Sequence, residues 1–240
     1  MNFDYLTINE AAKLLDVSID TLRRWDKNEK LKAVRQQKNG YRYYPKEIIE
    51  LYLKDIFAMA KKWATGSPVL PESEYYCPDS LVFKTRLGRL EKDLSKIDKI
   101  KNIFPLISAI AGEIGNNSYD HNLGNWPDIR GIFFAYDINK KQIVLADRGQ
   151  GLLKTLKKVR PGLSNDKEAL VVAFTEIISS RMPEARGNGL KFVRQVVSDN
   201  PFNLEFYTGS AKLFLEQGSR DLNIKNSDIK YPGCVSLIKF

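Results

Sequence analysis

The first thirty residues carry apolar positions at helical spacing, interrupted by one short turn. Thr7 and Glu10 have the spacing of a capping box, and a small apolar face follows over residues 11–15. Ser18 or Asp20 can cap a second helix, Ile19 to Lys27. Two short helices joined by a tight turn predict a helix-turn-helix.

The next segment, Leu31 to Tyr44, is polar and basic and contains Asn39-Gly40 between extended residues. Asn-Gly in this setting favours a β-hairpin, and a basic hairpin after a helix-turn-helix is typical of a wing. A helix from Lys46 to Trp63 follows, with an apolar face expected to pack on the helix-turn-helix.

The formal charge of +9 agrees with a polyanionic partner, and its distribution is more informative than its size. Basic side chains cluster between Arg23 and Lys46, where only Asp26 and Glu29 oppose them, which indicates an electrostatic footprint for double-stranded DNA. We expect DNA contacts from the start of the second helix and from the wing, namely Ser18, Thr21, Arg23, Arg24, Lys38, Tyr41 and Arg42.

The run Thr7–Asp26, followed by Asn39-Gly-Tyr-Arg-Tyr-Tyr-Pro45, resembles the MerR and excisionase winged helix-turn-helix domains over roughly Tyr5 to Leu53. The resemblance implies recognition of DNA by the 18–24 helix and backbone contacts by the wing. It also suggests a homodimer, because MerR proteins dimerise through a longer helix placed after this domain. The alternative is that this domain serves protein interaction.

A stretch rich in proline, glycine and serine begins at Ala64, so we expect domains at 1–63 and 81–240 with a linker at 64–80. A helix from Asp79 carries an apolar seam at spacings of four and three: Phe83, Leu87, Leu90, Leu94 and Ile97. We expect this seam to pack on the second domain. A dimer contact is the alternative.

A helix over 106–122 places four polar residues on one face, at spacings of three and four: Glu113, Asn117, Asp120 and His121. Such groups are costly on a buried helix unless they meet a ligand or one another. The Asn117 carbonyl oxygen suits Mg²⁺, and Glu113 is placed to activate a water or hydroxyl, which makes it the candidate catalytic residue.

Two glycine turns follow. Strands at 131–137 and 142–146 form a hairpin that runs into Asp147-Arg-Gly149-Gln-Gly151, where an acid at a strand end can accept the exocyclic amine of adenine. After helices at 152–159 and 167–180 and a short lid at 181–188, a last helix opens in a second turn and can bind phosphate: Arg186, Gly187, Asn188, Gly189 and Leu190. Strands at 204–208, 212–216 and 235–240 complete a sheet.

In this order the three motifs resemble the gyrase, chaperone, histidine-kinase and mismatch-repair (GHKL) ATPase superfamily over about 106–240. The resemblance implies a Bergerat-like ATP-binding fold, an α/β sandwich with one mixed sheet and helices on one face. The chain as a whole would be a two-domain α+β protein. ATP and Mg²⁺ are the implied cofactors, with Glu113 as base, Asn117 as metal ligand, Asp147 as adenine contact and the glycines as nucleotide-facing turns.

We therefore expect a transcription regulator in which nucleotide or a protein partner at the second domain changes operator binding. An ATPase or a serine/threonine kinase similar to anti-sigma-factor kinases is the alternative, and a domain that binds ATP without turnover, or no longer binds it, is a further one. The sole histidine, His121, lies inside the site motif, which excludes a histidine autokinase. No membrane span, signal peptide or disulfide framework is expected, and the expected compartment is the cytoplasm.

Overall fold

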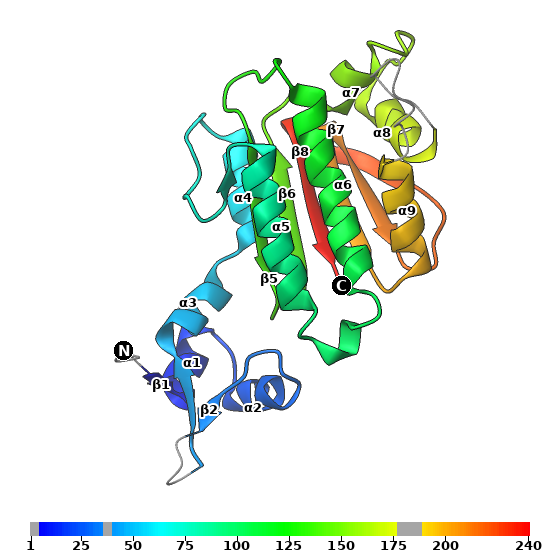
Figure 1. The fold of residues 1–240 in the computed structure, drawn as a ribbon. Coiled ribbons are helices and arrows are strands. Elements are labelled where there is room, and N and C mark those ends of the chain that lie inside the picture. Colours follow the sequence, from blue (N-terminus) through cyan, green and yellow to red (C-terminus); the bar gives the residue numbers. More distant parts are fainter. Residues whose placement is uncertain (1–4, 36–39, 177–188) are drawn as a thin grey trace. The chain divides into compact units, whose positions relative to one another are not determined.

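The computed structural model describes residues 5–35, 40–176 and 189–240, and the chain divides into two compact units at Asp55/Ile56 (Figure 1). The smaller unit contains a three-stranded antiparallel sheet in the order β1-β3-β2, with β3 in the centre. Its elements are β1 (Tyr5–Thr7), α1 (Ile8–Leu14), α2 (Ile19–Lys27), β2 (Val34–Arg35), β3 (Arg42–Pro45) and α3 (Lys46–Leu53).

The helix-turn-helix prediction is confirmed in its local detail. Thr7 and Glu10 form the reciprocal capping box, and the Ser18 side chain caps α2. Between the helices Asp16 has φ +51°, the left-handed conformation that Asp tolerates better than most residues. The core beneath both helices is small and apolar: Ala11, Ala12, Leu22, Leu31, Ala33, Tyr44 and Ile49.

The larger unit has a five-stranded sheet in the order β4-β5-β6-β8-β7. Its strands are β4 (Tyr76–Cys77), β5 (Ile132–Asp137), β6 (Gln142–Asp147), β7 (Asn203–Glu216) and β8 (Asn223–Lys239). Its helices are α4 (Ile56–Thr65), α5 (Ser80–Leu94), η1 (Asp98–Ile100), α6 (Phe104–Asn122), α7 (Gly151–Leu156), α8 (Asp166–Thr175) and α9 (Gly189–Asp199).

The alternation of side chains along the strands separates two apolar cores. On β5, Ile132 and Phe134 face the core formed with α5, α6, α8 and α9. Phe133 and Ala135 face the opposite side, where Ile56, Ala60 and Trp63 of α4 cover the sheet. The predicted hairpin at 131–146 is confirmed, and its strands pair from Ile132↔Asp147 to Asp137↔Gln142.

Three expectations about this sheet need correction. Every pairing in it is antiparallel, so the sheet is not mixed. Helix α4 covers the second face, so the helices are not confined to one face. The strands expected at 204–208 and 212–216 are one strand, because a bulge at Gly209, with φ +54°, lets the ladder continue past the irregularity.

The boundary region also differs from the expectation. The helix predicted from Lys46 to Trp63 is broken at Lys54–Asp55 into α3 and α4, and α4 belongs to the larger unit. Residues 64–80, expected as a linker, include β4, which pairs with β5. Buried apolar side chains at Trp63, Ala64 and Tyr75 explain why this stretch is held on the sheet.

The apolar seam of α5 is buried in the larger unit, as expected, and is not a free dimer surface. Phe83, Leu90 and Leu94 are fully buried. A Cβ at Gly115 would lie 2.2 Å from the Phe83 ring, so this glycine on α6 permits the close approach of the two helices. The seam thereby fixes α6, the helix that carries most of the predicted site.

Candidate functional site

In the smaller unit, the predicted DNA-contact residues on α2 are in part engaged with one another. The Ser18 Oγ accepts from the Thr21 amide at 3.1 Å and lies 2.9 Å from the Thr21 Oγ1. Arg23 forms an exposed ion pair with Asp20 at 2.9 Å, whereas Arg24 is exposed. The capping of α2 therefore accounts for Ser18 and Thr21. Of the two arginines, Arg24 is the one that is exposed and outside the Asp20 ion pair.

Asp26 connects α2 to both described strands of the wing, a role that the sequence did not suggest. Its Oδ1 accepts from the Ala33 amide at 3.0 Å, and its Oδ2 accepts from Arg35 Nη2 at 2.6 Å and Arg42 Nε at 2.7 Å. Burial raises the pKa of Asp26, but the Ala33 amide and the two arginines lower it more, so the net pKa lies below the usual value.

This contact changes the interpretation of the wing. Arg42, expected on the DNA backbone, is held by a carboxylate whose side chain is 3% exposed. Arg35 and Arg42 are opposite each other in the β2–β3 pair, so one carboxylate holds both strands. Tyr41 is 66% exposed, and Lys38 lies outside the described residues.

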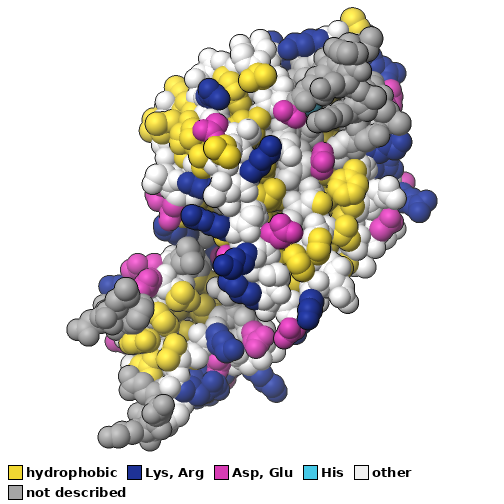
Figure 2. Space-filling model, viewed as in Figure 1, with side chains coloured by type: hydrophobic (Ala, Val, Ile, Leu, Met, Phe, Trp, Pro, Cys, Tyr) yellow, Lys and Arg dark blue, Asp and Glu magenta, His cyan; other side chains and the backbone are white. Residues whose placement is uncertain are grey.

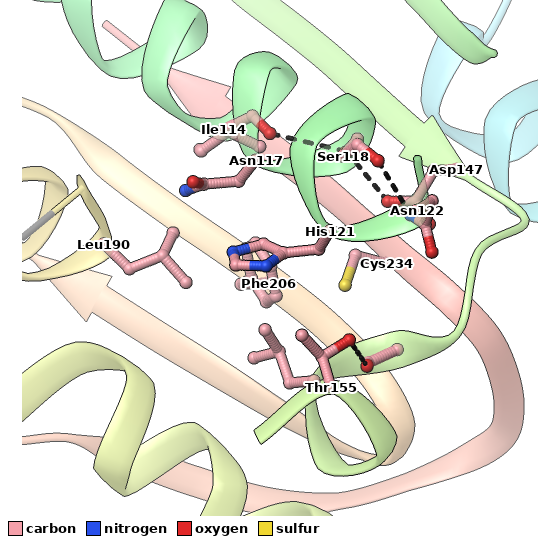
Figure 3. A pocket seen from close by; sticks show the side chains of 12 residues that line it. Ile114, Asn117, Ser118, His121, Asn122, Asp147, Thr155, Leu190, Phe206 and Cys234 are labelled. Atoms are coloured by element: carbon pink, nitrogen blue, oxygen red, sulfur yellow. Dashed lines mark hydrogen bonds between the residues drawn. The ribbon is translucent and has the colours of Figure 1, made fainter. Parts of the chain in front are cut away.

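In the larger unit, a pocket that is partly open to solvent lies where the predicted motif helix, the first glycine turn and α9 meet. Figure 3 shows His121, Thr155 and Leu190 reaching it from α6, α7 and α9. The lining residues are Ile114, Asn117, Ser118, His121, Asn122, Asp147, Gly151, Leu152, Thr155, Leu190, Phe206 and Cys234.

Asp147 is the buried carboxylate of this pocket, 2% exposed at the end of β6. Ser118 Oγ donates to its Oδ2 at 2.8 Å, and the Gly149 amide donates to its Oδ1 at 2.8 Å. Burial raises the pKa of Asp147 to about 6, with those two donors and the Cys234 amide acting in the opposite direction. None of the described Lys and Arg residues forms an ion pair with it.

The glycine turn after Asp147 is packed too tightly for side chains. A Cβ at Gly149 would lie 2.1 Å from Asn122 Nδ2, and one at Gly233 would lie 2.3 Å from the Asp147 backbone oxygen. Gly151 has φ +70° and opens α7. Asn122 holds the turn against α6, because its Oδ1 accepts from the Gln150 amide and its Nδ2 donates to the Ser118 carbonyl, both at 2.8 Å.

The structure brings together most, but not all, of the predicted ligand-contacting residues. A Cβ on Gly189 would lie 2.6 Å from Glu113 Oε2 and 3.2 Å from Asn117 Nδ2, so the motif helix faces the start of α9. Burial, with the charge of Lys158, lowers the pKa of His121. Asp120 is exposed and does not line the pocket, and Arg186, Gly187 and Asn188 lie outside the described residues.

Several pocket residues were missed from the sequence. Ser118 and Asn122 lie one helical turn apart beside the predicted set, so helical spacing could have found them. Phe206 and Cys234 come from β7 and β8, which are remote in sequence from the motifs and become neighbours only through strand pairing. Nothing local in the chain marks them as site residues.

Within the described ranges, no three His, Cys, Asp or Glu side chains gather as a metal-ligand group. No described helix is both long and apolar enough to cross a membrane. On the face in Figure 2, basic side chains over the larger unit are scattered among acidic and hydrophobic ones rather than gathered in one patch.

Comparison with known proteins identifies the smaller unit. Residues 7–44 match the family described as "MerR family regulatory protein". A stretch of 57 residues, 24% of this chain, is 39% identical to "Type II methyltransferase M.Eco47II" of Escherichia coli and covers 14% of that protein. The matched segment, with its capped helix pair and antiparallel hairpin, is a MerR-type helix-turn-helix DNA-binding domain.

Proposed function

We propose that the chain is a DNA-binding regulator whose larger unit binds Mg-ATP in the pocket around Asp147 and whose DNA affinity depends on nucleotide. The MerR-type domain supports the DNA-binding part. The nucleotide part rests on the pocket and on the resemblance of its motifs to the GHKL ATPases.

The observation that carries the nucleotide part is Asp147. A carboxylate has about four lone-pair sites, and the described donors, which are the Ser118 hydroxyl and the amides of Gly149 and Cys234, fill three of them and leave one for a ligand. A buried carboxylate without a cation is costly, and such groups are concentrated at functional sites. An exocyclic amine of a base is a neutral donor that suits this environment.

The apolar lining supports the same ligand. Ile114, Leu152, Leu190 and Phe206 can bury the faces of a planar base, while the base edge meets Asp147. Glu113 and Asn117 lie beside the start of α9, where helix amide groups favour phosphate. Asn117 would contribute a carbonyl oxygen to Mg²⁺, and the phosphates would complete its coordination.

An ATPase or a serine/threonine kinase is the second candidate. The position of Glu113, beside Asn117 and the first residue of α9, favours it, because a general base must lie near the phosphates. Under this alternative, Glu113→Ala abolishes turnover and retains ATP binding. The match to a methyltransferase covers too little of that protein to support methyl transfer here.

The experiment is a titration of the purified chain with Mg-ATP, followed by product analysis. Saturable binding without ADP supports the regulator, and binding with ADP release that Glu113→Ala removes supports the enzyme. The absence of binding at millimolar nucleotide refutes both nucleotide proposals and leaves the MerR-type domain unaffected.

A further inference from the structure

Asp147 and Arg148 are consecutive residues that lie on opposite sides of the sheet of the larger unit. Asp147 reaches Ser118 of α6 and lines the pocket. Arg148 reaches Trp63 at the end of α4, the helix that covers the other face. The alternation of side chains at a strand end produces this arrangement. The peptide unit between the two residues is therefore linked to the pocket through Asp147 and to α4 through Arg148.

Arg148 is an anchor of α4 rather than a surface cation. It is 5% exposed, and its Nη1 donates to the carbonyl oxygens of Trp63 at 2.6 Å and Gly66 at 3.0 Å. Its Nε and Nη2 hold both carboxylate oxygens of Asp128, at distances from 2.6 to 3.0 Å. A helix leaves its last carbonyls without intrahelical partners, and a cation there is favourable.

Helix α4 is also the connection to the DNA-binding unit. It begins at Ile56, directly after Asp55, the last residue of the smaller unit. Its buried side chains lie on the sheet, so its position follows that of the strands and of Arg148. A change in the backbone at 147–149 is therefore passed to α4 through a short, rigid guanidinium contact.

We infer that Arg148 couples occupancy of the pocket to DNA binding by holding the end of α4. This inference rests on the proposed function. A ligand that engages Asp147 and the following glycine turn displaces the peptide shared with Arg148. The guanidinium fork, which has four described acceptors, transmits that displacement to the carbonyls of Trp63 and Gly66, and α4 transmits it to Asp55.

The test compares wild type, Arg148→Gln and Arg148→Lys in the full chain. Lysine keeps the charge but lacks the planar fork, so it separates charge from geometry. Arg130→Gln is the control, because Arg130 is an exposed arginine whose loss changes net charge equally. DNA affinity is measured with a labelled duplex selected by the chain from a random library, with and without Mg²⁺ and a non-hydrolysable ATP analogue, at fixed salt.

In wild type and Arg130→Gln, we expect nucleotide to change the DNA dissociation constant about 5-fold or more. In both Arg148 variants, we expect nucleotide affinity to stay within about 3-fold of wild type and the DNA effect to disappear. Nucleotide-dependent hydrogen exchange of the α4 amides should disappear with it. A purely structural role for Arg148 would lower thermal stability and leave the nucleotide effect intact.

The outcomes separate the two claims. If wild type does not bind the nucleotide analogue, the proposed function fails and this inference fails with it. If wild type binds the analogue and DNA affinity does not respond, the coupling alone is refuted. If Arg148→Gln does not fold, Arg148→Lys alone tests the contact, because it keeps the charge and loses the fork, and an unchanged nucleotide effect in that folded variant refutes the role of Arg148.

Discussion

Asp26 Oδ2 accepts a hydrogen bond from Arg42 Nε at 2.7 Å, and this contact joins the second helix of the MerR-type domain to its wing. Arg35 reaches the same oxygen from the neighbouring strand. One buried carboxylate thereby positions two cations that the charge pattern alone would assign to DNA. The net charge near the wing is consequently lower than the count of its basic residues implies.

The first prediction concerns DNA contacts. Arg24→Gln should lower the slope of log affinity against log salt by about one phosphate contact, because Arg24 is exposed on α2. Arg42→Gln should change that slope less, because its Nε is held by Asp26. Fluorescence anisotropy over a salt series measures both, and a larger slope change for Arg42→Gln would contradict this assignment.

The second prediction concerns stability of the smaller unit. Asp26→Asn should lower its free energy of unfolding by about 2–3 kcal/mol, because the bonds to Arg35 and Arg42 lose their charge assistance. The expected loss is smaller than for a fully buried ion pair, because both arginines are partly exposed. The lowered pKa of Asp26 means that this contribution is present above the unfolded-state pKa and is lost on acidification through the folded-state pKa.

Chemical denaturation of the full chain, monitored by circular dichroism, measures the effect on the unfolding transition of the smaller unit. Asp20→Asn is the matched control, because it removes an exposed acid from the same helix, and we expect a change below about 0.5 kcal/mol. Equal effects of the two substitutions would show that Asp26 does not organise the wing.

The sequence predicted the MerR-type domain well because its signals are local: a capping box, a capped second helix and an Asn-Gly hairpin. It also grouped Glu113, Asn117 and Gly189 in one candidate site, and these three residues lie beside one another. It did not predict the role of Asp26, or of Arg148, because each depends on partners brought in by tertiary pairing. The predictions of a mixed sheet and of helices on one face only were wrong for the same reason. Alternating apolar residues specify neither the direction of a strand nor which helix covers which face.

The third prediction concerns Gly233 of β8, which packs against the glycine turn after Asp147. Gly233→Ala should destabilise the larger unit by about 2–3 kcal/mol, because its Cβ would lie 2.3 Å from Asp147 backbone oxygen and 2.6 Å from the Gly149 amide. Gly88→Ala should stabilise it by about 0.5–1 kcal/mol, since Gly88 is inside α5 and has open space around it. Thermal unfolding measures both, and a neutral Gly233→Ala would contradict the tight turn.

The fourth prediction concerns pH. The pKa of Asp147 is about 6 in the folded chain against 3.8 ordinarily, so the folded state keeps the Asp147 proton up to a higher pH than the unfolded state does. The free energy of unfolding therefore falls as pH rises through this window, by up to about 3 kcal/mol. Asp147→Asn has no carboxyl group to titrate at this position, so its free energy of unfolding relative to wild type should increase between about pH 4 and pH 7.

Urea unfolding of both proteins at the two pH values measures this difference, with Asp221→Asn, an exposed acid, as the control. A constant difference across pH would show that Asp147 titrates normally. The same protonation should weaken nucleotide binding below about pH 6, because a protonated carboxyl has less acceptor capacity for a base amine.

The central claim is that Asp147 receives the base of a nucleotide. Calorimetric titration of the full chain with Mg²⁺ and a non-hydrolysable ATP analogue, in wild type and Asp147→Asn, tests it most directly. We predict saturable one-site binding to wild type and a loss of at least about tenfold in affinity for the variant, equal to about 1.4 kcal/mol. No binding to wild type, or equal binding to a folded Asp147→Asn, would contradict the claim.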